Sequence, residues 1–180
     1  LTHLDLSNNS IRDISSLTGL KNITDLNLQR NVVNDLSTLS TLTTLINLDV
    51  SYNKISSLSP ISTAVGMKKL IAGNNSLTDT TGIEALVALE ELDLSHNSIA
   101  NISGLSACAA LTTLNVSNNK ISSISVISGL VKLSQLNFAY NSVTEIPTLN
   151  KESVLGNING SHNNIKKLTA LKGLRYLRVV

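Results

Sequence analysis

The stretch LEELDLSHNSI, residues 89–99, contains the pattern that decides the fold. Leucines at its first, fourth and sixth positions precede Asn97 and Ile99. The chain begins with the same pattern, LTHLDLSNNSI, at residues 1–11. The asparagine recurs every 22 residues, at Asn9, Asn31, Asn53, Asn75, Asn97, Asn119, Asn141 and Asn163. A fixed period of this length is typical of stacked repeats that are each too small to bury their own apolar face.

The repeated asparagine is the one polar member of an apolar set, so we expect it to point inward. A buried polar group must be hydrogen-bonded. Asparagine offers both an amide donor and a carbonyl acceptor on one neutral side chain. We therefore predict a structural role: it satisfies backbone groups where the chain leaves a strand, and it links one repeat to the next.

Each repeat contains two apolar patterns when positions are counted from its first residue (Leu1, Ile23, Leu45, Met67, Leu89, Leu111, Leu133 and Leu155). Positions three to seven alternate polar and apolar, which predicts a strand with one buried face. Positions 14, 17 and 20 are apolar, as in Ile14, Leu17 and Leu20, and this spacing suits one turn of 3₁₀ or α helix. Position 15 is a hydroxyl residue in seven of the eight repeats, so we predict that it caps the turn.

Three repeats depart from the pattern. Ala72 in the fourth repeat and Gly160 in the eighth replace larger strand residues, which predicts a thinner core at both places. Glu152 occupies position 20 of the seventh repeat, where the other repeats place apolar residues. We therefore expect a remodelled convex loop around Lys151 and Glu152.

The composition restricts the classes of function. A net charge of +2 gives no argument for nucleic-acid binding, and no apolar run approaches the ~18 residues of a membrane span. The one cysteine, Cys108, has no partner for an internal disulfide, and its position 20 predicts burial. We expect one repeat domain over residues 1–180: eight repeats and the first four residues of a ninth, Leu177 to Val180. Because Leu1 already starts a repeat and no polar cap is visible at either end, we expect a fragment without a signal peptide.

The motif Leu-x-x-Leu-x-Leu-x-x-Asn-x-Ile, followed by Ile-x-x-Leu-x-x-Leu, resembles the 22-residue class of leucine-rich repeat. That class includes bacterial internalins and the regulatory subunit of type 1 protein phosphatase. The resemblance implies an α/β solenoid: a right-handed superhelix with a concave parallel β-sheet and short 3₁₀ or α turns on the convex side. It also implies protein binding through the concave sheet.

No catalytic or cofactor motif is present. With strands ~4.8 Å apart, His3, His96 and His162 should lie roughly 19 and 14 Å from one another along the sheet, too far for one metal ion. The chain has no glycine-rich phosphate loop, no His-Glu-x-x-His and no paired-cysteine motif. We therefore predict that the protein is not an enzyme and that it binds no cofactor, no metal ion and no small-molecule substrate.

Positions three, five and seven should face the concave side. In the first five repeats these positions carry His3, Asp5, Asp25, Asp49, Lys69, Glu91 and Asp93. In the next three repeats they carry Thr113, Asn115, Gln135, Asn137, Asn157 and Asn159. An acidic half thus adjoins a neutral amide half. The pattern suits either a solvated strand surface or a docking face for a basic segment.

Position eight, at the exit of each strand, collects the residue types found at binding hot spots. It is Arg30, Tyr52, His96, Tyr140 and His162 in five repeats, and asparagine in the other three. The alternative is chance placement on a turn. Our candidate protein-binding residues are these five together with Asp5, Asp25, Asp49, Glu91 and Asp93.

We predict a non-catalytic scaffold that binds another protein through the concave sheet and the adjoining strand-exit edge. The alternatives are a bacterial surface adhesin of internalin type and a regulatory subunit of a protein phosphatase. We expect a cytoplasmic location, including association with the cytoskeleton, because Asn115-x-Ser and Asn159-x-Ser on the concave strands would place glycans on the sheet in a secretory route. The alternative location is the bacterial surface or the secreted fraction.

Overall fold

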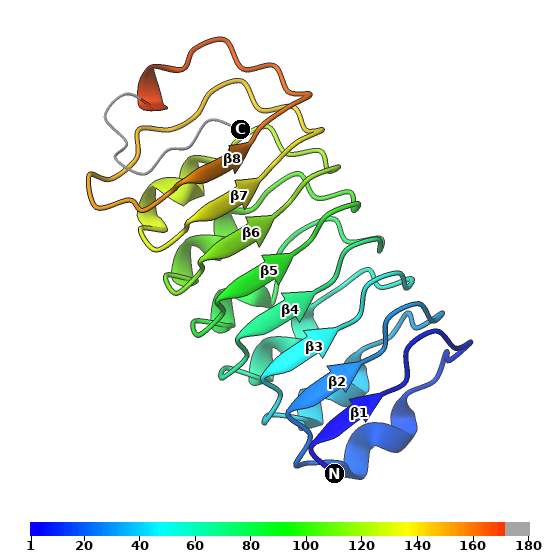
Figure 1. Cartoon of the computed structure of the whole chain (residues 1–180). Coiled ribbons are helices and arrows are strands. Elements are labelled where there is room, and N and C mark those ends of the chain that lie inside the picture. The colour runs from blue at the N-terminus through cyan, green and yellow to red at the C-terminus, as the bar shows by residue number, and fades with distance from the viewer. Residues whose placement is uncertain (172–180) are drawn as a thin grey trace.

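The computed structural model describes residues 1–171, and in this range one parallel sheet runs through all eight repeats, with neighbouring strands in sequence order (Figure 1). Its strands are β1 His3–Asp5, β2 Asp25–Asn27, β3 Asn47–Asp49, β4 Lys69–Ile71, β5 Glu91–Asp93, β6 Thr113–Asn115, β7 Gln135–Asn137 and β8 Asn157–Asn159. The register is strict, because Leu4 pairs with Leu26 and Leu26 pairs with Leu48. The predicted start of a ninth repeat, Leu177 to Val180, lies outside the described residues.

The convex side is built from short 3₁₀ helices, which lie behind the sheet in Figure 1. Their bounds are η1 Ser15–Gly19, η2 Ser37–Thr41, η3 Ser59–Thr63, η4 Ile83–Ala85, η5 Ser103–Ala107, η6 Ser125–Gly129 and η7 Thr169–Leu171. The predicted turn is thus confirmed as 3₁₀, and Pro60 occupies the start of η3, where its missing N–H costs nothing. The result is an open, right-handed solenoid with the sheet on its concave side. No helix within residues 1–171 has the length and apolar character that crossing a bilayer requires.

The hydroxyl residues at position 15 do not cap these helices, so that prediction was wrong. The side chain two residues earlier, at position 13, accepts the position-15 backbone N–H instead. Asp13 and Asp35 do so at 2.8 Å, Asp79 at 2.9 Å and Asn101 at 2.8 Å. An aspartate or asparagine just before a turn is suited to this bond, because its short side chain reaches the N–H two residues on.

The asparagine column joins neighbouring repeats as predicted. Asn97 Nδ2 donates to the carbonyl of Ala72 in the preceding repeat at 3.1 Å, and to Leu94 and Ser95 of its own repeat at 3.0 and 3.1 Å. Its Oδ1 accepts the N–H of Leu77 at 2.9 Å. The column is less buried than expected. Asn31 is buried, most of the others are half-buried, and Asn9, which has no preceding repeat in this chain, is exposed.

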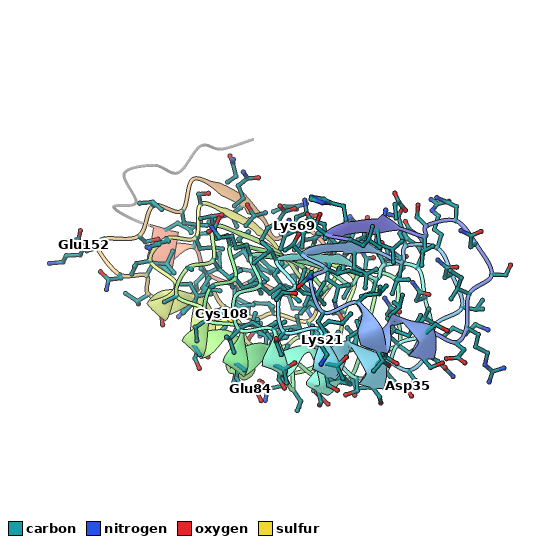
Figure 2. All side chains as sticks on the ribbon, turned by 90° about the horizontal axis from the view of Figure 1, so that it is seen from below. Lys21, Asp35, Lys69, Glu84, Cys108 and Glu152 are labelled. Carbon is teal, nitrogen blue, oxygen red and sulfur yellow. The ribbon has the colours of Figure 1, made fainter. Side chains whose placement is uncertain are left out.

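The two irregular regions near the C-terminal end differ in outcome. The convex loop of the seventh repeat is remodelled as predicted, since no helix is assigned between β7 and β8 among the described residues. Glu152 is exposed and points away from the body (Figure 2). The core at Gly160 is not thin, contrary to expectation. The fully buried Phe138 ring lies where a Gly160 side chain would be, with Cε2 2.9 Å from the position of a Cβ.

Candidate protein-interaction surface

A second polar ladder runs along the concave face at position five. In seven of the eight repeats the side chain there accepts the backbone N–H of position seven, where the chain leaves the strand. The strands are three residues long instead of the five that the alternation suggested, and β4 has the same length although Ile71 makes no such bond. The bonds run from Ser7 to Asp5 at 2.8 Å, Gln29 to Asn27 at 3.0 Å, Ser51 to Asp49 at 2.9 Å, Ser95 to Asp93 at 2.8 Å, Ser117 to Asn115 at 3.2 Å, Ala139 to Asn137 at 3.1 Å and Ser161 to Asn159 at 3.2 Å.

Three predicted binding residues, Asp5, Asp49 and Asp93, therefore have a structural task. Asparagine performs the same task in four other repeats, so the turn needs the side-chain oxygen and does not need the charge. For Asp5, the bond from the Ser7 backbone lowers the pKa of the carboxyl group. The negative charge at these three positions is an addition to the ladder that the fold does not require.

The other concave carboxylates lie in local networks. Asp25 accepts the Thr24 hydroxyl at 2.6 Å and the Asn47 amide at 2.7 Å, and its Oδ2 lies 3.2 Å from His3 Nε2. The Thr24 hydroxyl is the largest cause of the lowered pKa of Asp25. Glu91 pairs with Lys69 at 3.0 Å. Its neighbour Lys68 pairs with Glu90, also at 3.0 Å.

Two shallow hollows lie along the concave sheet. One, of about 310 Å³, covers β1 to β4 and is lined by His3, Asp5, Asp25, Asn47, Asp49, Lys69 and Ile71. The other, of about 550 Å³, covers β6 to β8 and is lined by Thr113, Asn115, Gln135, Asn137, Asn157 and Asn159. Each hollow thus lies within one of the two predicted halves, and Glu91 and Asp93 of the acidic half line neither hollow.

Position eight has an unusual backbone. Its φ lies between 52° and 57° in all eight repeats, which is the left-handed region. The residues are Asn8, Arg30, Tyr52, Asn74, His96, Asn118, Tyr140 and His162. Asparagine tolerates this conformation best among residues with a side chain, and bulky residues are strained in it. This conformation was not predicted from the sequence, although the Asn-Asn pairs at residues 8–9, 74–75 and 118–119 are a signal for it.

Two neighbouring pairs stack on this edge. The Arg30 guanidinium lies 4.8 Å from the centre of the Tyr52 ring, a cation–π distance. The Tyr140 and His162 rings stack with centroids 4.0 Å apart and an angle of 10° between planes. Both tyrosines stay half-exposed, at 46% and 52%. Tyr52 and Tyr140 lie four strand spacings apart, roughly 19 Å, so the structure forms two platforms and not one cluster.

His96 lies between these platforms, with Asn74 and Asn118 at position eight of the repeats on either side. It is exposed and completes the row of five predicted edge residues. All five lie three residues beyond position five, at the margin of the concave face. The edge and the concave carboxylates thus form adjoining parts of one surface.

Sequence reasoning missed two residues in the fourth repeat. Ile71 interrupts the position-five ladder, and Gly73 is the one position-seven residue without a side chain. Ile71 breaks the aspartate/asparagine pattern at position five, and Gly73 breaks the serine-rich pattern at position seven. Both can be found in the sequence once the roles of these positions are known.

Cys108 is not a candidate nucleophile. It is fully buried, as predicted, and its Sγ lies 3.5 Å from the carbonyl oxygen of Ile83. Burial is the main cause that raises the pKa of the thiol to about 11, and the Glu84 carboxylate adds to it. The thiol is therefore protonated at neutral pH and lacks the thiolate character of reactive cysteines.

These features define a repeat scaffold whose candidate site is an open surface. The family model described as leucine-rich repeats (two copies) matches residues 1–42, 65–107, 87–130 and 109–151. The chain belongs to the leucine-rich-repeat family. Proteins of this family are generally protein-interaction scaffolds, and the fold is typically non-catalytic.

Solved structures agree with this fold. The chain is similar to an internalin from Listeria monocytogenes, with 24% identity and a TM-score of 0.77 over 99% of this chain and 60% of that one. It is similar to internalin C2 from the same organism, with 25% identity and a TM-score of 0.80 over 98% of this chain and 69% of that one. A leucine-rich-repeat protein from Leptospira interrogans gives 25% identity and a TM-score of 0.89 over 98% of this chain and 47% of that one. Comparison with curated proteins gives no significant match.

Proposed function

We propose that this chain is a non-catalytic scaffold whose partner protein contacts the concave sheet and the position-eight edge together. The observation that carries the proposal is the left-handed backbone at position eight. Asparagine, present at Asn8, Asn74 and Asn118, meets the demands of this turn. Tyrosine and arginine fit it less well, so their presence is explained by what their side chains do outside the turn.

The exposed chemistry of the edge supports the proposal. Tyrosine and arginine are enriched among the few residues that dominate binding energy. The stacking of Arg30 on Tyr52 and of Tyr140 on His162 holds these side chains in place before a partner arrives. Less side-chain entropy is then lost on association. The charge of Asp49 and Asp93 on the adjoining strands, which the ladder does not need, favours a partner with a basic surface.

The experiment that tests this proposal compares three immobilised proteins in affinity capture followed by mass spectrometry. They are the wild type, an edge variant with Tyr52→Asn and Tyr140→Asn, and a control with Lys21→Ala and Lys132→Ala at the opposite edge, where the chain runs toward the next strand. Asparagine is chosen because it already occupies this position in three repeats. We expect a partner held by the wild type and the control to be lost by the edge variant. A partner retained equally by all three would place its site elsewhere on the solenoid.

A second candidate is a bacterial surface adhesin of internalin type. The likeness to two internalins supports it, although the chain spans 60% of one and 69% of the other. Under this proposal the protein lies at the cell surface or is secreted, and under the first it lies in the cytoplasm. Detection of the tagged full-length protein on intact cells, before and after protease treatment, separates the two locations.

A further inference from the structure

The position-five ladder is broken once, at Ile71. Among the residues at positions three, five and seven of the eight repeats, Ile71 is the one large apolar side chain. It lies half-buried on a concave face that is otherwise polar. It cannot accept the N–H of position seven, as asparagine or aspartate does in the other seven repeats. The fourth repeat thus lacks this hydrogen bond and places an apolar side chain on the concave face of the solenoid.

A second break lies beside the first, at Gly73. The position-seven side chains form a row between the concave sheet and the position-eight edge, and in five repeats the residue is serine. A Cβ on Gly73 would lie 3.0 Å from Ser95 Oγ and 3.3 Å from Asp93 Oδ1. These contacts are tighter than ordinary van der Waals contact, so the Ser95 and Asp93 side chains leave little room for a side chain at position 73. The carbonyl of Gly73 accepts the backbone N–H of Tyr52 at 2.9 Å, so the two residues adjoin through their backbones.

The charges around Ile71 are negative on both sides. In the strand register Ile71 pairs with Asp49 on β3 and with Asp93 on β5, which places these carboxylates roughly 10 Å apart. Lys69, two residues before Ile71 on β4, is already paired with Glu91 at 3.0 Å. The hollow of about 310 Å³ over β1 to β4 includes both Asp49 and Ile71 in its lining. An apolar side chain between two carboxylates therefore lies at one end of a hollow, and Gly73, two residues further on, adds no side chain of its own.

We propose that an extended basic segment of the partner protein crosses from the edge to the concave sheet at the fourth repeat. This inference rests on the function proposed above and names the chemistry of the partner. The aliphatic stem of a lysine or arginine lies on Ile71, and its charged group reaches Asp49 or Asp93. Such side chains bury their stems on apolar surface while the charge stays with polar groups. Gly73 lets the partner backbone approach closely, as glycine does at ligand contacts.

The proposal is tested first with labelled peptides of about seven residues, roughly 24 Å when extended. In these peptides threonine alternates with one test residue: lysine, norleucine, glutamate or 2,3-diaminopropionate. Norleucine keeps the stem without the charge, and 2,3-diaminopropionate keeps the charge on a one-carbon stem. By fluorescence anisotropy we expect the lysine peptide to bind the wild type at least about tenfold more tightly than the other three. Equal affinity for the lysine and glutamate peptides, or no binding of the lysine peptide, would overturn the proposal.

The second test uses variants that restore the column residues of the other repeats. Ile71→Asn returns the acceptor to the ladder, and Gly73→Ser introduces the commonest residue of its row, whose Cβ would lie 3.0 Å from Ser95 Oγ. The matched control is Ala139→Ser, the same kind of change in the amide half. We expect both fourth-repeat variants to keep the wild-type circular dichroism spectrum and to bind the lysine peptide roughly tenfold more weakly. Ile71→Asn should also keep the unfolding midpoint, and the midpoint of Gly73→Ser measures what the shift of the Ser95 side chain costs. The control should bind as the wild type does.

The result separates this inference from the proposed function. If Ile71→Asn and Gly73→Ser both bind the lysine peptide like the wild type, the crossing point at the fourth repeat is wrong. The scaffold proposal then still stands if the edge variant with Tyr52→Asn and Tyr140→Asn loses its captured partner. If the edge variant keeps that partner while Ile71→Asn loses the peptide, the basic segment is supported and the position-eight edge is removed from the site.

Discussion

Asn97 donates a hydrogen bond of 3.1 Å to the carbonyl of Ala72, 25 residues earlier in the chain, and so joins two consecutive repeats where they stack. Its side chain makes three further bonds, two as donor and one as acceptor. One neutral amide thus satisfies four backbone groups at the point where the chain leaves the strand. The same kind of bond recurs along the solenoid. The free energy of unfolding is therefore approximately a sum of contributions from single repeats and from the contacts between neighbouring repeats.

Replacement of Asn97 by alanine should lower the free energy of unfolding by about 2–3 kcal/mol, because the buried backbone groups lose their partners. The matched control is Asn9→Ala. Asn9 is exposed, and its amide donates only within its own repeat, to Leu6 and Ser7 at 3.1 Å each. Urea unfolding followed by circular dichroism measures both losses. A loss at Asn97 no larger than the loss at Asn9 would contradict the linking role.

Phe138 and Gly160 should behave as a coupled pair. Gly160→Ala places a methyl group against the Phe138 ring, and overpacking of this kind costs typically about 1–3 kcal/mol. Phe138→Leu in the same protein makes room for this methyl group. The double variant should therefore lose less free energy of unfolding than the two single variants lose in sum. The control is Gly129→Ala, where nothing lies within 4 Å of the new Cβ. Strict additivity of the two losses would show that the ring moves away at no cost.

The periodic part of this structure was predictable because each repeat contacts mainly its neighbours, so the leucine and asparagine columns carry the strand, the turn and the register. The capping residue was misassigned because Asp13 and Ser15 are both good cap residues, and composition does not say which of the two accepts the bond. Gly160 was misjudged because its compensation, Phe138, lies in another repeat. The stacking of Tyr140 on His162 depends on side-chain torsions that no one-dimensional pattern contains.

Acid should weaken the convex turns at Asp35. The Ser37 hydroxyl and the Ser37 backbone N–H, at 2.6 and 2.8 Å, lower the pKa of the Asp35 carboxyl group in the folded chain. Since the folded pKa lies below the unfolded value of about 3.9, the stabilisation is complete above that pH and is lost as the pH falls through the folded pKa. Asp35→Asn keeps an acceptor, as Asn101 does in the fifth repeat, without the titration.

The measurement compares the urea midpoints of the wild type and Asp35→Asn at about pH 6 and about pH 3. Asp13 and Asp79 also have a lowered pKa, mainly from the backbone N–H that each accepts, so the triple asparagine variant enlarges the effect. In acid, we expect the urea midpoint of the wild type to fall further than the urea midpoint of the triple variant. Parallel losses would assign the acid sensitivity to other carboxylates.

Cys108 should report global unfolding. The thiol is buried and its pKa is raised to about 11, so a disulfide reagent at neutral pH should not modify the native protein. In denaturing urea the same reagent should modify one thiol per chain, since the sequence has one cysteine. Stopped-flow absorbance across a urea series tests whether the modification rate follows the unfolded fraction. Rapid modification in the absence of urea would show that the fifth repeat opens locally.

Tyr52→Asn and Tyr140→Asn should each raise or preserve stability. Asparagine accepts the left-handed backbone with less strain, a difference worth up to about 1–2 kcal/mol. The loss of a stacked partner offsets part of this gain, by about 0.5–1 kcal/mol for an exposed cation–π pair. If binding of the captured partner falls while the unfolding midpoint rises, the tyrosines are retained for recognition at a cost in stability. A loss of more than about 1 kcal/mol in the free energy of unfolding would instead show that the two stacked pairs belong to the framework that holds the edge together.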